Sequence, residues 1–463
     1  MIDKSFAHFA VNCRRALKSA AILLFTALGS LTGNVSHSQE VGPLKVSATG
    51  RYLINRDKGE PFLVLGDTGW SLIAQAREQD IEKYLDDRQK RGFNSIIVNL
   101  IEHKFSDAPP KNRSGLAPFS KAGDLSTPNS DYFDFAAKVI ESANHRGIVV
   151  WLAPAYLGYA GGDEGFFREI KAGGREKLKA YGDFVGRRFR DMPNIVWILG
   201  GDYTPEPMDR WTITDLGRSI WQQDTNHLMI VHAAPETSAT VLFGSEEWLA
   251  LGSVYSYDKA LFGPVLAEYA RRPLRPFVLL ESTYESEHNS TPSQIRRQAY
   301  WTVLGGGCGH FFGNNPIWHF DGPGLFPINL TWLEALDGTG SRDMARLRKC
   351  FLALPWSKLR PEENHAIITD GFGQDNATCL TAVTPDGYCS VSYIPSTGTE
   401  AKELTANAAA FPHAINARWY NPTTGNSSEV PGSPFANRGL QHLRTPGDNG
   451  ARDNDWVLIL RAE

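Results

Sequence analysis

The chain has 463 residues, of which 42% are hydrophobic and 21% charged, and its formal net charge is −4. This length exceeds one small domain and suits a barrel with an accessory domain, and the apolar content is sufficient for a packed core. The absence of a basic excess argues against nucleic acid or an anionic membrane as a partner, because nothing would neutralise the phosphates.

The first 38 residues are predicted to be an export signal. Arg14 and Arg15 precede an apolar run at residues 20–31, and residues 36–38 offer small side chains to a signal peptidase. The apolar run is too short to anchor the chain in a membrane. Both a Sec signal and a twin-arginine signal fit this pattern. We therefore expect an exported protein, periplasmic or extracellular, and we expect it to be a monomer.

Residues 39–60 are predicted to form a β-ribbon, with its strands within residues 46–55. Between residues 61 and 356, short apolar runs alternate with segments of helical spacing. The apolar runs lie at residues 62–66, 93–101, 148–153, 195–199, 228–232, 253–257, 277–280 and 309–313. The helical segments lie at residues 80–91, 132–146, 175–189, 211–223, 265–272 and 293–304. Eight apolar strands alternating with helices predict an α/β fold, a closed (β/α)8 TIM barrel with a parallel sheet.

A helical segment at residues 343–354 is followed by a region of different character. From residue 365 to 463, short strand-like runs are separated by turn sequences, which predicts a small antiparallel β-sandwich. Cys379 and Cys389 flank one such turn, so a disulfide between them is one alternative in an oxidising compartment. The other alternative is that both thiols stay free.

In a TIM barrel the functional side chains follow the carboxyl ends of the strands. Carboxylates, aromatic rings, amides and a histidine follow the predicted strands, and this combination suits a sugar-binding pocket. The candidate substrate-binding residues are Asp67, Trp70, Asn99, Tyr203, His232, Tyr255, Tyr284, Glu285, Asn315 and Trp318. Simpler structural roles stay open: a loop cap for Asp67, a core position for His232, and a plug of the barrel top for the two tryptophans.

Two carboxylates stand where an apolar strand ends, Asp202 after the fourth run and Glu281 after the seventh. Glycoside hydrolysis uses two carboxyl groups that flank the scissile bond, and a separation of about 5 Å indicates a retaining reaction. We predict Asp202 as the general acid/base and Glu281 as the nucleophile. Glu285 is a competing candidate for the nucleophile, and Asp202 alone could instead cap a helix.

Other chemistries find little support in the sequence. The His-Glu-x-x-His pattern of zinc hydrolases and the Gly-x-Ser-x-Gly pattern of serine hydrolases are both absent. The cysteines show no Cys-x-x-Cys spacing, so a structural zinc site is not expected either. We therefore expect no metal and no cofactor.

Four motifs together resemble the apiosidase-like glycoside hydrolases, family 140. They are Gly66-Asp67-Thr68-Gly69-Trp70, Gly200-Gly201-Asp202, Glu281-Ser282-Thr283-Tyr284-Glu285 and Arg296-Arg297-Gln298-Ala299-Tyr300-Trp301. The resemblance covers residues 46–356, and a sandwich commonly follows in this family. It implies cleavage of apiosidic bonds, as in the rhamnogalacturonan II side chains of pectin. It also implies a catalytic Asp after strand four and Glu after strand seven, which match Asp202 and Glu281.

Two alternatives to this function stay open at the level of sequence. One is a glycosidase of another specificity, acting on a different furanoside or on a β-glycan. The other is a non-catalytic carbohydrate-binding or adhesion protein built on a barrel. In each case a polysaccharide or oligosaccharide is the expected partner, and the sandwich could bind glycan or only cover apolar surface of the barrel.

Overall fold

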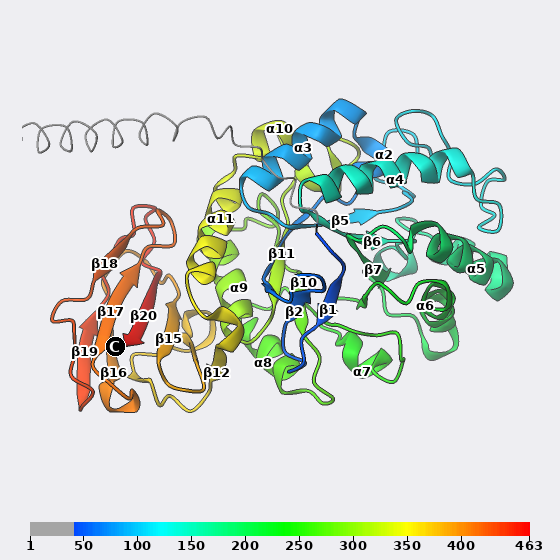
Figure 1. Ribbon diagram of the computed structural model, residues 1–463. Coiled ribbons are helices and arrows are strands. Elements are labelled where there is room, and N and C mark those ends of the chain that lie inside the picture. Colours follow the sequence, from blue (N-terminus) through cyan, green and yellow to red (C-terminus); the bar gives the residue numbers. More distant parts are fainter. Residues whose placement is uncertain (1–40) are drawn as a thin grey trace, which may run out of the picture. The chain divides into compact units, whose positions relative to one another are not determined.

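The structure is a computed structural model that describes residues 41–463 (Figure 1). The predicted export signal at residues 1–38 lies outside this part of the chain. Within the described residues, no helix has both the length and the apolar character needed to cross a membrane. The described chain folds as a (β/α)8 barrel followed by antiparallel sheets, which confirms the predicted fold class.

Eight parallel strands form the barrel, and each coincides with one predicted apolar run. They are β4 (Val64–Thr68), β5 (Ser95–Asn99), β6 (Val149–Ala153), β7 (Ile195–Gly200), β8 (Met229–His232), β9 (Gly252–Tyr255), β10 (Phe277–Glu281) and β11 (Gly309–Phe312). Their order in the sheet is β8-β7-β6-β5-β4-β11-β10-β9. A parallel bridge between Met229 and Leu249, and a hydrogen bond from Ser253 Oγ to the Val231 carbonyl, bring the two edge strands together.

The strands are apolar throughout because both of their faces are buried. In β7, Val196 and Ile198 point into the barrel and join its central cluster. Ile195, Trp197 and Leu199 alternate with them and pack against the surrounding helices. This double burial explains why the sequence shows continuous apolar runs instead of alternating ones.

Helices cover the outside of the barrel. The longer ones are α3 (Glu78–Lys90), α4 (Ser130–His145), α5 (Phe167–Phe189), α6 (Trp211–Gln223), α8 (Phe262–Ala270), α9 (Pro292–Leu304) and α11 (Thr339–Leu352). Short helices α2 (Leu72–Gln75), α7 (Ala239–Phe243) and α10 (Trp332–Ala335) were not predicted. Helix α5 begins eight residues before the predicted start, because the chain continues helically on both sides of a kink at Gly174, where φ is 77°. A glycine adopts this positive φ without a steric penalty.

A three-stranded antiparallel sheet precedes the barrel and consists of β1 (Leu44–Val46), β2 (Leu53–Asn55) and β3 (Pro61–Phe62). Leu44 and Leu53 belong to the same buried cluster as Val64 and Val278, which lie at the amino ends of barrel strands. The sheet therefore closes the end of the barrel opposite to the one where the predicted site residues emerge.

The C-terminal region is built from two antiparallel sheets. The larger sheet has the order β12 (Arg360–Glu362), β14 (Leu380–Val383), β15 (Cys389–Ile394), β20 (Trp456–Ala462), β17 (Ile415–Tyr420) and β18 (Ser427–Glu429). The smaller sheet has the order β13 (Ile368–Asp370), β16 (Glu403–Asn407) and β19 (Leu440–Arg444). A separate buried cluster that includes Trp419 and Leu458 forms its core.

The four cysteines within residues 41–463 are all free and buried. The alternative of a Cys379–Cys389 disulfide is therefore not realised. In the β14–β15 hairpin, Leu380 pairs with Tyr393 and Val383 with Ser390, so the two cysteines stand at opposite ends of the hairpin. Half-cystines need Cα atoms about 4.4–6.8 Å apart, which this register does not permit.

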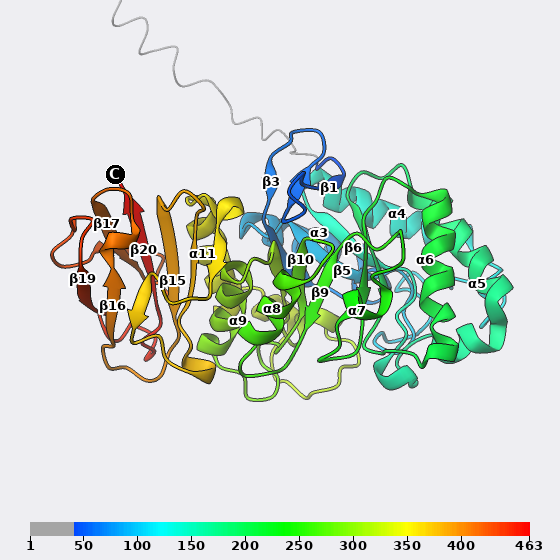
Figure 2. The ribbon, with the colours of Figure 1, turned by 90° about the horizontal axis from the view of Figure 1, so that it is seen from below.

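The sandwich packs against α9 and α11 of the barrel (Figure 2). Arg296 of α9 is fully buried and donates to both Asp455 of the sandwich, at 2.7 and 2.8 Å, and Asp343 of α11, at 2.9 Å. One turn further along α9, the Tyr300 ring stacks on Tyr393 of β15, with centroids 4.7 Å apart. The motif at residues 296–301 is thus the surface on which the two parts of the chain meet.

Candidate active site

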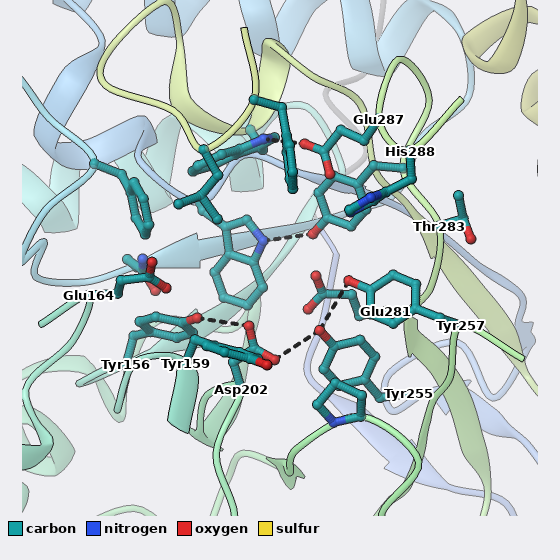
Figure 3. A pocket seen from close by; sticks show the side chains of 18 of the residues that line it. Tyr156, Tyr159, Glu164, Asp202, Tyr255, Tyr257, Glu281, Thr283, Glu287 and His288 are labelled. Carbon is teal, nitrogen blue, oxygen red and sulfur yellow. Dashed lines mark hydrogen bonds between the residues drawn. The ribbon is translucent and has the colours of Figure 1, made fainter. Parts of the chain in front are cut away.

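A cavity of about 660 Å³ opens at the carboxyl ends of the barrel strands (Figure 3). Aromatic rings, four carboxylates and one lysine dominate its lining. The lining residues are Trp70, Asn99, Phe105, Tyr156, Tyr159, Glu164, Asp202, Pro235, Tyr255, Tyr257, Lys259, Glu281, Thr283, Tyr284, Glu287, His288, Gln294, Trp318, Leu325 and Phe326. Both predicted catalytic carboxylates, Asp202 and Glu281, therefore face one cavity.

Asp202 owes its position to the two glycines before it. Gly200, Gly201 and Asp202 all have positive φ values, 86°, 127° and 55°. A Cβ atom at Gly201 would lie 2.3 Å from the ring of Tyr156, so only glycine allows strand β7 to end this close to that ring. A left-handed aspartate is uncommon, and the tight turn aims its carboxyl group into the cavity.

The Asp202 carboxyl group is fixed by two tyrosines. Tyr255 donates to its Oδ1 at 2.8 Å, and Tyr156 donates to its Oδ2 at 3.2 Å. Burial, and after it the nearby charge of Glu281, raise the pKa of Asp202 to about 6, although both tyrosine hydrogen bonds act in the opposite direction. Asp202 can therefore hold a proton at mildly acidic pH, as a general acid must.

Glu281 is connected to Asp202 through His232. The backbone N–H of Asp202 donates to His232 Nδ1 at 2.8 Å, so Nδ1 carries no proton. The proton of the neutral ring is therefore on Nε2, which lies 2.7 Å from Glu281 Oε2 and donates to it. The imidazole thus donates an N–H to the Glu281 carboxyl group and fixes its position in the cavity.

The histidine ring is held between two aromatic side chains. Tyr255 stacks on it with ring centroids 4.9 Å apart, and Trp70 contacts it from another side at 5.7 Å. His232 is 1% exposed and does not line the cavity, so the structure gives it a positioning role in place of the predicted contact with substrate.

Two tryptophans form part of the cavity wall, and each has its indole N–H occupied. Trp70 donates to the Tyr284 hydroxyl at 3.0 Å, and Trp318 donates to Glu287 Oε1 at 2.9 Å. The rings are therefore fixed, and both line the cavity, where aromatic surface can meet the C–H groups of a sugar.

Besides His232, four of the predicted substrate-binding residues do not line the cavity. Asp67 is fully buried and bonded to Tyr84 and Arg88, so its side chain does not reach the cavity in this structure. Tyr203 packs against Phe167 with ring centroids 4.9 Å apart, away from the cavity.

The other two are held by hydrogen bonds to both backbone and side-chain groups. Glu285 accepts from the Gly340 N–H at 2.7 Å and from Asn314 Nδ2 at 2.9 Å, and both partners lie behind the cavity wall. Asn315 donates to the Phe326 carbonyl and accepts from His319. Because Glu285 is turned away from the cavity that holds Asp202, its position does not support it as the competing nucleophile.

The cavity also contains residues outside the predicted set. Glu164, Glu287 and Lys259 bring further charges, and Phe105 and Phe326 add aromatic surface. These residues lie well beyond the strand ends, in loops whose direction the sequence does not reveal. Lys259, Phe105 and Glu287 follow the last residues of β9, β5 and β10 by four, six and six positions, so proximity to a strand end could have pointed to these three.

The arrangement matches what acid-assisted nucleophilic displacement at a sugar requires: one carboxyl group with a raised pKa, a second carboxylate, and fixed aromatic faces. Among residues 41–463, no three or more His, Cys, Asp and Glu side chains are grouped so that they could hold a metal ion.

Comparison with known proteins agrees with this chemistry. A family model described as the apiosidase-like catalytic domain matches residues 47–358, and a model of a proposed collagen-binding domain of a collagenase matches residues 364–461. A solved structure titled glycoside hydrolase is 25% identical, with a TM-score of 0.78, and covers 91% of this chain and 97% of its own.

A glycoside hydrolase family 5 structure from Bacteroides vulgatus is 24% identical, with a TM-score of 0.79, and covers 93% of this chain and 95% of its own, which shows the fold. No protein of curated function matches the sequence. Since the catalytic model spans more than half of the chain, the protein is a glycoside hydrolase that belongs to the apiosidase-like family.

Proposed function

We propose that this protein is an exported, retaining glycosidase that cleaves apiosidic linkages in the rhamnogalacturonan II side chains of pectin. Membership of the apiosidase-like family supports the choice of sugar. The observation that carries the reaction class is the pairing of Asp202 and Glu281 in one cavity, joined through His232. Asp202 follows strand β7 and Glu281 ends strand β10, and these strands are separated by β8 and β9 around the barrel.

The proposed reaction is a double displacement. The Glu281 carboxylate attacks the anomeric carbon, while the Asp202 carboxyl group donates its proton to the leaving oxygen, so that the glycosidic C–O bond breaks and a glycosyl ester forms. Asp202, now ionised, removes a proton from water. The resulting hydroxide attacks the anomeric carbon, releases the sugar and regenerates the Glu281 carboxylate. Two inversions leave the anomeric configuration unchanged.

His232 and the tyrosines support the two roles without reacting. The His232 N–H stabilises the carboxylate form of Glu281 before attack and again when it leaves the ester. Tyr156 and Tyr255 hold the Asp202 carboxyl group in place through both proton transfers. For the sandwich we propose a structural role, because its contact with α9 is built around the buried Arg296 and a stacked tyrosine pair.

The test is a product assay on the purified protein with rhamnogalacturonan II and a panel of aryl glycosides. We expect free apiose from the polysaccharide and, with methanol as acceptor, a methyl glycoside of retained configuration. Turnover of another glycoside alone would keep the reaction class and overturn the substrate. Glycan binding without any turnover would favour the non-catalytic alternative.

The nucleophile is tested with Glu281→Ala. We expect turnover to be abolished while folding and sugar binding stay near wild type, and we expect added azide to restore activity and give a glycosyl azide of inverted configuration. The matched variant is Glu285→Gln, which tests the competing carboxylate. A Glu281→Ala protein that keeps most of its rate would overturn the assignment.

A further inference from the structure

The cavity contains a third buried carboxyl group that the double displacement does not use. Glu287 lies in the loop between β10 and α9, lines the same cavity as Asp202 and Glu281, and is 9% exposed. A buried carboxylate is costly unless its oxygen atoms have hydrogen-bond donors. The presence of this group in the wall of a sugar pocket therefore needs a reason.

One oxygen of Glu287 has a fixed protein partner and the other faces the cavity. Oε1 accepts from Trp318 Nε1 at 2.9 Å. Oε2 has no hydrogen-bond partner within the described residues, yet it is not among the fully enclosed polar atoms. Figure 3 shows the Glu287 side chain directed into the cavity, with only one of its oxygens on the dashed bond to the indole. The second oxygen is thus an accessible acceptor.

The position of this acceptor is well defined. Trp318 is itself fixed by an edge-on contact with Phe105, with ring centroids 4.9 Å apart at 83°. The backbone around Glu287 is also constrained, because Ser286, His288 and Asn289 all adopt positive φ values, which are uncommon for residues other than glycine. Backbone conformations of this kind cost free energy and persist only where the surrounding structure holds them. They are frequent at functional sites.

A carboxylate at the edge of an indole ring that lines the same cavity matches the chemistry of a sugar, which presents hydroxyl donors at its edge and C–H groups on its face. We propose that Glu287 is a specificity-determining residue that accepts hydrogen bonds from hydroxyl groups of the sugar held at the Asp202–Glu281 pair. In this role it also holds Trp318 as the adjoining stacking surface. The inference rests on the proposed glycosidase function and adds the residue that recognises the sugar.

The test uses an aryl glycoside that the wild-type protein cleaves, because its leaving group carries no second sugar. Glu287→Gln keeps the size and an acceptor for Trp318 but removes the charge. Burial raises the pKa of Glu287 to about 7, so the assay is run at about pH 8, where the group is ionised. Loss of a hydrogen bond to a charged group should then lower kcat/KM of this variant by about 10- to 100-fold. Trp318→Phe keeps both the ring face and the Glu287 charge, so its loss should be smaller. Glu363→Gln, an exposed position remote from the cavity, is the matched control and should behave as wild type.

Deoxy substrates identify the contact itself. Wild-type enzyme should lose rate on the glycoside that lacks the recognised hydroxyl group, whereas Glu287→Gln should show no further loss on that same substrate. A merely structural role for Glu287 would lower the rate on every analogue by the same factor. The proposal would be overturned if, for every deoxy substrate, the effect of the Gln substitution and the effect of the missing hydroxyl group simply multiplied. It would also be overturned by a kcat/KM for Glu287→Gln within about two-fold of wild type.

Failure of the proposed function gives a different result. If the wild-type protein cleaves no glycoside in the panel, calorimetric titration with apiose, arabinose, xylose and rhamnose replaces the kinetic assay. Weaker binding of the same sugar by Glu287→Gln, with unchanged thermal unfolding, would support the recognition role while catalysis fails. Equal binding by both proteins, or no binding of any of these sugars, would overturn it.

Discussion

His232 connects the two proposed catalytic carboxylates, Asp202 and Glu281, through its two nitrogen atoms, and its substitution can separate these contacts. Asparagine places its amide oxygen near the position of Nδ1, so His232→Asn retains an acceptor for the Asp202 N–H and loses the donor to Glu281. Glutamine reaches the position of Nε2, so His232→Gln retains a donor to Glu281 and loses the acceptor. The two variants therefore test the two hydrogen bonds one at a time.

The size of the effect follows from the geometry. The Nε2–H bond to Glu281 is 2.7 Å long, is made to a carboxylate and is largely buried, with side chains that are 1% and 11% exposed. Bonds of this kind contribute about 1.5–3 kcal/mol, and each 1.4 kcal/mol changes a rate about tenfold. We therefore expect His232→Asn to lower kcat/KM by about 10- to 100-fold. His232→Gln should lose less activity, with a larger share of its cost in stability because a backbone N–H is left unpaired.

The assay combines steady-state kinetics on an aryl glycoside with thermal unfolding of both variants. Partial recovery of kcat in His232→Gln relative to His232→Asn, at comparable stability, would mark His232 as a positioning residue. If both variants kept the wild-type kcat and differed only in unfolding temperature, the imidazole would be a core histidine, and the reasoning about Glu281 would be refuted.

Three further predictions concern the acid, the domain contact and the thiols. Because Asp202 holds its proton up to about pH 6, kcat/KM should fall as the pH rises above this value. If the same alkaline decrease of kcat/KM persisted in Asp202→Asn, it would contradict the assignment of Asp202 as the acid. Arg296→Met should lower the free energy of unfolding in urea by about 3–5 kcal/mol, because it strands buried carboxylates. Arg444→Met, whose side chain is 70% exposed, should cost less than about 1 kcal/mol, and equal losses would contradict this account. Dithiothreitol should leave the unfolding temperature unchanged, since all four cysteines of residues 41–463 are free; a decrease would reveal a disulfide.

The sequence by itself determined the barrel, since strands buried on both faces must be apolar throughout, as in the run at residues 195–199. It also placed Asp202 and Glu281 at the cavity, because the carboxyl ends of all barrel strands meet at one mouth. The rule does not hold for every side chain there, since His232 at the end of β8 does not line the cavity. Helix ends were less well determined, as the early start of α5 shows. A glycine inside a kinked helix, such as Gly174, cannot be distinguished in the sequence from a glycine that ends a helix.

What only the tertiary structure decided is the direction of side chains beyond the strand ends. Glu285 and Glu287 are two residues apart in one loop, and the sequence favoured the first as a site residue. The fold turns Glu285 toward Gly340 and Asn314, and turns Glu287 toward Trp318 and the cavity. Their hydrogen-bond partners lie far away in the sequence. Which of the two side chains faces the cavity therefore depends on the distant donors that each carboxylate reaches, and the local sequence does not predict this.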